Sequence, residues 1–270
     1  MKTETRLDRL SALLHGLAPR VELAYAAATQ STRSVPASRE AMLHVHLLEG
    51  PLQLQANGQT SQVCEPAFWI CRADTAHTIA APTPQALDAV VSANVHLDGP
   101  VAPLLLAAFA QPKLVPLDTP DTLLTHVIAL VRSELQAPRC GQPALLNRAG
   151  DILFIGLMRH LVAQPQTAGG LFSGLADTRI ATALVAMHEA PERNWTLESL
   201  AQRAGMSRTA FAVRFKSTIN RSPGKYLSGL RMQIARRSVQ AGLGLKAAAR
   251  AAGYGNVSAL SRALGKAQAE

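Results

Sequence analysis

The segment from Trp195 to Gly253 decides the fold, and it reads WTLESLAQRAGMSRTAFAVRFKSTINRSPGKYLSGLRMQIARRSVQAGLGLKAAARAAG. Near its start, apolar residues recur at the spacing i, i+3, i+4 and i+7, which predicts a short helix with one buried stripe. These residues are Leu197, Leu200, Ala201 and Ala204. Gly205 can take the positive φ of a turn, and Ser207 is a favoured N-cap for a second helix. The pattern predicts a helix-turn-helix.

The same pattern occurs a second time in this segment. The apolar stripe returns 48 positions later, and Gly253 stands where Gly205 stood. The members of the second stripe are Leu245, Ala248, Ala249 and Ala252. Between the two copies, Ser222 and Pro223 provide the favoured first residues of a long helix. We therefore expect two helix-turn-helix units that are joined by one helix.

Three motifs in this region resemble the DNA-binding domain of the AraC family of transcription regulators. They read LESLAQRAGMSRTAFAVRFK, SPGKYLSGLRMQIARR and AARAAGYGNVSALSRAL. The resemblance implies an all-α domain over residues 175–270 that binds double-stranded DNA, with the second helix of each unit in a major groove. The residues that it assigns to DNA contact are Arg208, Thr209, Ala212, Val213, Lys216, Arg231, Arg236, Ser258 and Arg262. Of these, we expect Lys216, Arg231 and Arg236 to meet phosphates rather than bases.

The second unit departs from the family pattern. It has alanine at 248 and 252 and leucine at 260 and 264, and the sequence ends six residues after Leu264. Small side chains bury less apolar area, so we expect the second unit to be less stable than the first. A shortened regulator that dimerises but has lost specific DNA binding is therefore one alternative.

The charge is unevenly distributed along the chain. The 270 residues carry a net charge of +9, but residues 177–270 alone hold 15 basic and 5 acidic residues, or +10. A near-neutral region followed by a basic one is typical of a sensing domain joined to a polyanion-binding domain. Basic surface that only improves solubility is the alternative. No apolar run approaches the ~18 residues of a membrane span, and the first twenty residues are too charged for a signal peptide. We expect a cytoplasmic protein without membrane contact.

The N-terminal part of the sequence has the rhythm of short strands. Leu52 to Ala56 alternates apolar and polar residues, and Asn57-Gly58 is a strong signal for a tight hairpin. The expected strands are 21–26, 42–48, 52–56, 62–70 and 89–97. Short strands with tight turns over about a hundred residues predict an antiparallel barrel or double-sheet roll.

The stretch LHVHLLEGPLQLQANGQTSQVCEPAFWICRADTAHTI resembles the cupin-type sensing domain found ahead of AraC-type DNA-binding domains. The resemblance implies a small-molecule effector, with His44, His46 and His77 as the candidate effector-binding residues. Metal-binding cupins add a carboxylate, but Glu49 lies at the wrong parity to share a strand face with His46. We therefore expect no metal and no cofactor, and the cupin-type metalloenzyme remains an alternative to the regulator. A redox sensor that uses Cys64 and Cys71 is a further possibility.

Residues 101–190 carry helical patterns, the strongest at 121–136 and 144–161. The regulators that the chain resembles use such helices for self-association, so we expect a homodimer through a segment of about 119–164. A linker over 164–174 would separate a sensing domain at 1–170 from the DNA-binding domain at 175–270. The predicted fold class is α+β. The predicted function is a DNA-binding transcription regulator controlled by an effector in the cupin-like domain, with contact to RNA polymerase left open.

Overall fold

The computed structural model describes residues 8–24, 29–117, 122–164 and 169–269. The chain divides into two compact units. A β-rich unit contains residues 18–98 and 102–161, and a helical unit contains the residues up to 17, residues 99–101 and the residues from 162 onward. The predicted boundaries at 170 and 175 stay a prediction.

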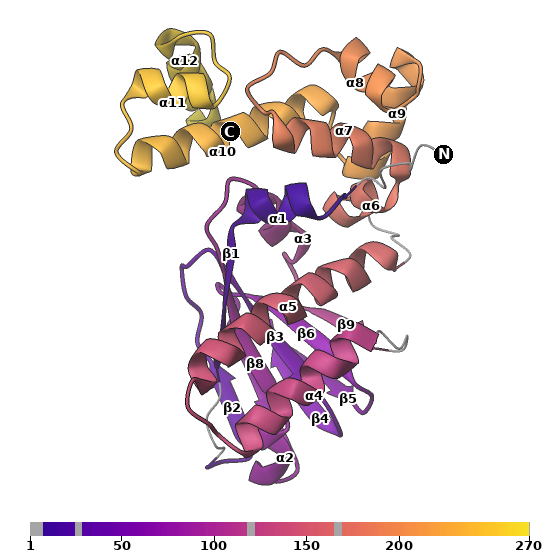
Figure 1. The fold of residues 1–270 in the computed structure, drawn as a ribbon, viewed down its shortest axis with the longest axis vertical. Helices are drawn as coiled ribbons and strands as arrows, with labels where there is room; N and C mark the ends of the chain where they lie inside the picture. The colour runs from indigo at the N-terminus through magenta and orange to yellow at the C-terminus, as the bar shows by residue number, and fades with distance from the viewer. Residues whose placement is uncertain (1–7, 25–28, 118–121, 165–168, 270) are drawn as a thin grey trace. The chain divides into compact units, whose positions relative to one another are not determined.

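The β-rich unit contains two antiparallel sheets (Figure 1). The first sheet has the order β1(Pro19–Ala24), β8(Val91–Leu97), β3(Met42–Leu48), β6(Ala67–Arg72) and β9(Lys113–Pro116). The second has the order β2(Thr32–Val35), β7(His77–Ala80), β4(Leu52–Ala56) and β5(Gln59–Val63). This arrangement confirms the predicted double-sheet roll and the α+β class.

Strand β3 is buried along its whole length, because both faces of the first sheet are covered. On one face, Val45 and Leu47 share an apolar layer with Leu153 and Phe154 of α5(Gln142–Ala163). Gly150 allows this close approach, because a Cβ there would lie 2.8 Å from the Val21 side chain. Figure 1 shows α5 and α4(Thr122–Gln136) crossing the sheet. The alternate side chains of β3 therefore point to the other face, toward the second sheet.

Two sequence predictions about the roll differ in outcome. The Asn57-Gly58 hairpin is confirmed, since both residues have positive φ, 50° and 72°, between β4 and β5. The single strand expected over 62–70 is wrong, because β5 ends at Val63 and β6 begins at Ala67. Pro66 cannot donate to a strand ladder, which explains the break. The strands β2, β7 and β9 are four residues each, too short to show a clear alternation.

The remaining helices follow the caps that the sequence offers. Short helices in the β-rich unit are α2(Pro84–Asp88) and α3(Ala102–Ala108). The helical unit contains α1(Ser11–Leu17), α6(Leu171–Ala176), α7(Thr178–Glu189), α8(Leu197–Arg203), α9(Arg208–Ile219), α10(Pro223–Gln240), α11(Leu245–Ala251) and α12(Val257–Ala269). The predicted linker overlaps α6, so its second half is helical; residues 165–168 lie outside the described residues. Among the helices described, none has the length and apolar character needed to cross a membrane.

Candidate nucleic-acid interface

The first helix-turn-helix unit consists of α8 and α9, and its turn is built as the sequence predicts. Thr196 and Ser199 form a reciprocal capping box at the start of α8, and the Ser207 hydroxyl accepts from the Ala210 amide at the start of α9. Gly205 has a φ of 61°. Both helices therefore begin at defined residues, which fixes the angle between them.

Aromatic rings fill the core under α9. Phe211 and Phe215 are completely buried, with ring centroids 5.5 Å apart, and Tyr226 of α10 packs edge-on against Phe215 at 5.8 Å. The Tyr226 hydroxyl and His188 Nε2 of α7 lie 2.7 Å apart. Burial lowers the pKa of His188 to about 4. Four helices, α7 to α10, thus share one packed core.

The face of α9 opposite this core carries the predicted contact residues. Arg208, Thr209, Val213 and Lys216 are exposed, and Ala212 is half-buried. Val213 is the most exposed large apolar residue described, at 66%. In the second unit, Ser258 and Arg262 of α12 are exposed as well. The structure therefore leaves these predicted positions accessible in both units, and Arg236 of α10 is half-buried.

Arg231 has a different environment from the one predicted for a phosphate contact. Its Nε donates to the Pro191 carbonyl at 2.7 Å, and its Nη2 donates to the Arg193 carbonyl at 2.8 Å. Both acceptors lie in the loop between α7 and α8. Burial lowers the pKa of this guanidinium, and the charges of Tyr254 and Glu192 partly oppose that shift. Charge counting could not find this role, because it depends on where the side chain points.

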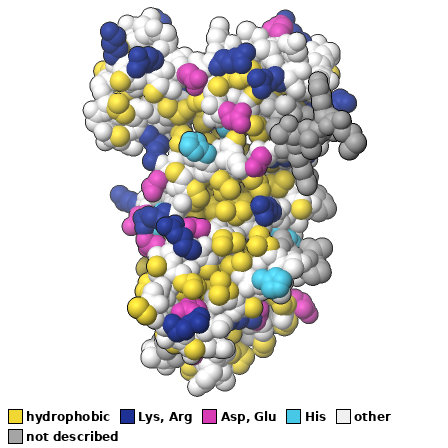
Figure 2. Space-filling view, viewed as in Figure 1, with side chains coloured by type: hydrophobic (Ala, Val, Ile, Leu, Met, Phe, Trp, Pro, Cys, Tyr) yellow, Lys and Arg dark blue, Asp and Glu magenta, His cyan; other side chains and the backbone are white. Residues whose placement is uncertain are grey.

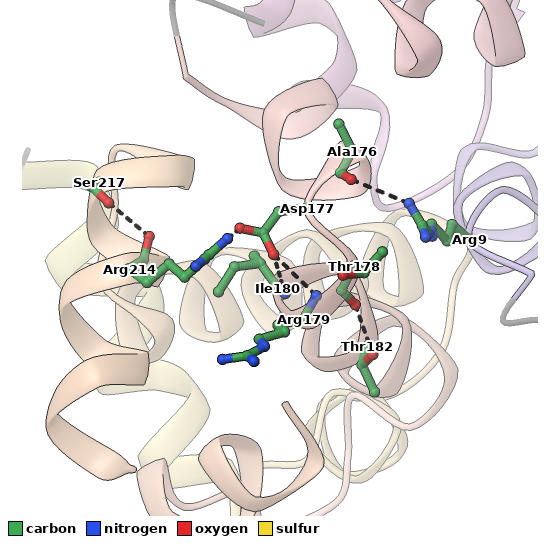
Figure 3. A network of polar contacts seen from close by, with 9 residues as sticks. All are labelled: Arg9, Ala176, Asp177, Thr178, Arg179, Ile180, Thr182, Arg214 and Ser217. Atoms are coloured by element: carbon green, nitrogen blue, oxygen red, sulfur yellow. Dashed lines mark hydrogen bonds and ion pairs between the residues drawn. The ribbon is translucent and has the colours of Figure 1, made fainter. Parts of the chain in front are cut away.

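Two further charges of the first unit are also engaged internally. Arg214 of α9 donates from Nε to the Asp177 carboxylate at 2.6 Å, and Asp177 also caps α7 through the Arg179 and Ile180 amides (Figure 3). Burial raises the pKa of this carboxyl, but the hydrogen bonds outweigh burial, so its pKa lies below the ordinary value. Arg208 pairs with Glu198 at 2.9 Å, where both side chains are exposed.

The core of the second unit is small. It consists of Ala235, Ala248, Ala249, Ala252 and Leu260, with Ile234, Tyr254 and Leu264 packed at its edge. Ala248, Ala249 and Ala252 are buried as the sequence predicts, but Leu245, the first member of the predicted stripe, is exposed, and Ala235 of α10 takes part instead. Each alanine contributes little buried area, so little packing energy holds α11 and α12 against α10.

In the β-rich unit, the three predicted histidines do come together. His44 and His46 of β3 and His77 of β7 are 6%, 2% and 3% exposed. His77 Nδ1 donates to the Thr75 carbonyl, so the Nε2 of the neutral ring accepts; His46 Nε2 therefore donates to it across 2.8 Å. Burial holds the pKa of His46 well below its ordinary value and lowers that of His77. His46 and His77 thus form a neutral hydrogen-bonded pair, and His44 Nδ1 lies 2.9 Å from Asn94 Oδ1.

This cluster does not fit a metal ion. The His46–His77 bond places a proton between two of the three Nε2 atoms that a metal would need as free lone pairs. Glu49, the carboxylate nearest in sequence, forms an ion pair with Arg132 of α4. No group of three or more His, Cys, Asp or Glu within the described residues could hold a metal ion.

A cavity of about 580 Å³ lies beside the cluster rather than inside it. The residues that line it are Arg33, Glu49, Gln85, Asp88, Ala89, Val90, Val91, Arg132, Leu135 and Gln136. Arg33 connects the two sites, because its Nη1 donates to Ser92 Oγ at 3.1 Å and Ser92 Oγ bonds His46 Nδ1 at 2.8 Å. No sequence pattern predicts this cavity, because its charged residues come from β2, α2, α4 and the turn after β3.

The three cysteines differ in their exposure to solvent. Cys71 is buried, and burial raises the pKa of its thiol to about 12. Cys64 and Cys140 are exposed. Because a reactive thiol needs a thiolate, Cys71 is a poor redox partner for Cys64.

Comparison with known proteins agrees with this architecture. A family model described as a cupin matches residues 8–163, and one described as a helix-turn-helix domain matches residues 200–268. This chain belongs to the AraC family. Its AraC-type helix-turn-helix units follow a cupin domain, as the sequence motifs predict.

Relatives of this AraC-family chain are named as regulators. An AraC-like transcription regulator of Streptomyces lividans is 35% identical over 150 residues, which is 54% of this chain and 49% of the relative. The regulator AlkR of Acinetobacter baylyi is 32% identical over 134 residues, 49% of this chain and 44% of the relative. The chain thus matches about half the length of these relatives.

The solved structures that match this chain superpose on it weakly. ToxT from Vibrio cholerae O395 covers 91% of both chains at 10% identity, with a TM-score of 0.36. The AraC-like transcriptional activator CuxR covers 86% of this chain and 90% of its own at 12% identity, with a TM-score of 0.30.

Proposed function

We propose that this AraC-family chain binds double-stranded DNA through both helix-turn-helix units and regulates transcription. The observation that carries the proposal is the exposed face of α9, where Thr209 and Val213 stand clear of the core beside Lys216. Residues 195–270 hold 13 basic and 2 acidic residues, a net charge of +11, which suits a polyanion. Contact with RNA polymerase and a cytoplasmic location stay predictions.

Base and phosphate contacts can be told apart by experiment. Duplex sequences selected from a random pool by the full chain should contain two half-sites about 10 base pairs apart. On such a duplex, Thr209→Ala should cost about 1–3 kcal/mol, and it should leave binding to random DNA unchanged. Lys216→Ala should weaken binding to both and lower the log–log salt slope by about 0.9. A folded protein that binds no duplex at low salt would refute the proposal.

The effector of this regulator, we propose, binds in the cavity lined by Arg33 rather than among the three histidines. The cavity has the volume of a ligand site and combines apolar Val90 and Leu135 with charged groups. His46 and His77 are buried and bonded to each other, so they are better suited to respond through Ser92 than to touch a ligand; His44 bonds Asn94 instead.

This proposal can be tested with a set of small organic acids, amines and zwitterions as probes. A probe that raises the melting temperature of the wild type should lose that effect in Arg33→Ala. Arg20→Ala removes the same charge from an exposed position of the same unit and should leave the effect intact. Equal shifts in the wild type and in Arg33→Ala would rule out this cavity.

Self-association, we propose, uses the outer face of α4 and α5. Leu123 and Leu130 of α4 are 36% and 42% exposed, and Ile152 of α5 is 39% exposed. Figure 2 shows hydrophobic side chains gathered over these helices. Leu130→Glu should convert a dimer to a monomer in sedimentation experiments, and Leu114→Glu on β9, at a similar exposure of 39%, should not. A wild type that sediments as a monomer at micromolar concentration would contradict this assignment.

A further inference from the structure

The loop over residues 190–195, between α7 and α8, contacts the connecting helix α10 and the turn of the second helix-turn-helix unit. Its contact with the connecting helix α10 is made by Arg231, which bridges the carbonyls of Pro191 and Arg193 at 2.7 and 2.8 Å. The planar guanidinium holds Nε and Nη2 in a rigid fork, which lets it donate to two acceptors on one loop at once. Two of its five N–H donors are thereby directed into the protein rather than toward a phosphate.

The same loop touches the turn of the second unit. Gly253 has a φ of 73°, and a Cβ placed on it would lie 2.6 Å from Glu192 Cα and 2.9 Å from the Glu192 carbonyl oxygen. Gly205 holds the equivalent place in the first unit with a φ of 61°, and a Cβ there would have nothing within 4 Å. Both turns need the left-handed conformation, but only the second also needs the missing side chain. The turn and the loop are packed backbone against backbone.

At its other end, the loop is fixed to the first unit. The Trp195 ring is 9% exposed, and its Nε1 donates to the Ala190 carbonyl at 2.8 Å, which closes the loop on itself. The Arg193 guanidinium lies 4.5 Å from the Trp195 ring centroid, and that of Arg203 in α8 lies 5.2 Å from it. Gly253 therefore packs against a loop that is held rigidly at Glu192.

The second unit needs such a support because its own core is weak. Four alanines and Leu260 form the buried contact of α11 and α12 with α10. Alanine side chains make few interlocking contacts, so they resist rotation of one helix pair about another poorly. The pair of contacts at Arg231 and Gly253 supplies the missing restraint.

We propose that Arg231 and Gly253 are positioning residues that set the orientation of the second helix-turn-helix through the 190–195 loop. The inference rests on the proposed DNA binding, since its consequence is felt at the second half-site. The second helices of the two units must enter major grooves about 34 Å apart. A second unit that rotates freely on α10 reads its half-site only for a fraction of the time.

The test uses the full chain and the bipartite duplex selected from a random pool. Binding is measured on this duplex and on two others in which one half-site or the other is scrambled. In the wild type, scrambling the second half-site should weaken binding by at least about 5- to 150-fold, the usual effect of a single mismatched base pair. In Arg231→Lys and Gly253→Ala, that penalty should fall to about twofold or less, while the penalty for the first half-site stays as in the wild type.

Matched variants separate positioning from charge. Arg231→Lys keeps the positive charge but replaces the planar fork with a single nitrogen, so it cannot hold the two carbonyls in the Nε and Nη2 geometry; a phosphate contact would survive it and a positioning role would not. Arg237→Ala removes a charge from an exposed residue of the same helix and should keep both half-site penalties. Gly205→Ala brings the same backbone strain into the first turn and should keep the penalty at the second half-site.

Two measurements test the positioning role of Arg231 and Gly253. Arg231→Lys could lose as much affinity as the wild type when each half-site is scrambled, and Arg231→Ala could lower the salt slope by about 0.9. These two results together would show a phosphate contact and overturn the inference. If the folded wild type binds no duplex, the proposed function is refuted but the positioning role is not. Amide exchange then tests directly whether the 190–195 loop stabilises the second unit. Exchange over residues 245–264 should be faster in Arg231→Lys and Gly253→Ala than in the wild type and Arg237→Ala; equal exchange would overturn the inference.

Discussion

Acidification from pH 8 to pH 5 should destabilise the helical unit through His188, a residue near the end of α7. Its ring stacks on Tyr226, and burial raises the pKa of that phenol, so the hydroxyl stays protonated while it shares a hydrogen bond with His188 Nε2. Burial lowers the pKa of His188 to about 4. A proton on this ring would leave a charge among the aromatic rings of the core.

The sign and the size of the effect follow from proton linkage. The folded ring binds its proton near pH 4 and the unfolded one near pH 6.5, so the unfolded chain holds more protons between these values. The contribution of this neutral ring to the free energy of unfolding is fully present above pH 6.5 and is lost as the pH falls. The loss from this one group should be about 2 kcal/mol at pH 5 and should approach about 3.4 kcal/mol below pH 4.

Urea unfolding at pH 8, 6 and 5 measures this loss. The chain has two tryptophans, so in a Trp69→Phe background the fluorescence of Trp195 reports the helical unit alone. In His188→Gln, which keeps a hydrogen-bond acceptor but does not titrate, the fall in unfolding free energy should be smaller by about 2 kcal/mol at pH 5. An identical fall in both proteins would refute the reasoning, as would an imidazole NMR titration of His188 near pH 6.5.

Three further predictions concern other parts of the chain. Asp177→Ala should lower the free energy of unfolding of the helical unit by about 1–2 kcal/mol through the lost cap, and Asp177→Asn, which still caps, should cost less; equal losses would show that the Arg214 pair dominates. Amides after Gly244 should exchange faster than those of residues 196–220 in the absence of DNA, because the alanine core buries less area; equal protection would show a sound second core. Elemental analysis of purified protein should find no stoichiometric transition metal, and about one metal per chain that disappears in His77→Ala would contradict the hydrogen-bonded cluster.

Local chemistry explains which parts of the fold the sequence could predict. The caps at Ser207 and Ser222, the turn at Gly205 and the Asn57-Gly58 hairpin each depend on residues within a few positions of one another. Such signals act through backbone conformation and can be found without knowing the rest of the molecule. The signal for the strand break at Pro66 is equally local, but the apolar residues near it favour one continuous strand.

The charges show why the functional site could be predicted only in part. If all 13 basic residues after position 194 met phosphates, the log–log salt slope would be about −12. Arg214 is held by Asp177 and Arg231 by the 190–195 loop, while Arg208 faces Glu198. These partners lie between 10 and 40 positions away in the sequence, so no spacing rule reveals them. Basic side chains that the fold already uses are less available to release counterions from DNA. Eight of the other basic residues are exposed among those described, and they support a slope no steeper than about −7.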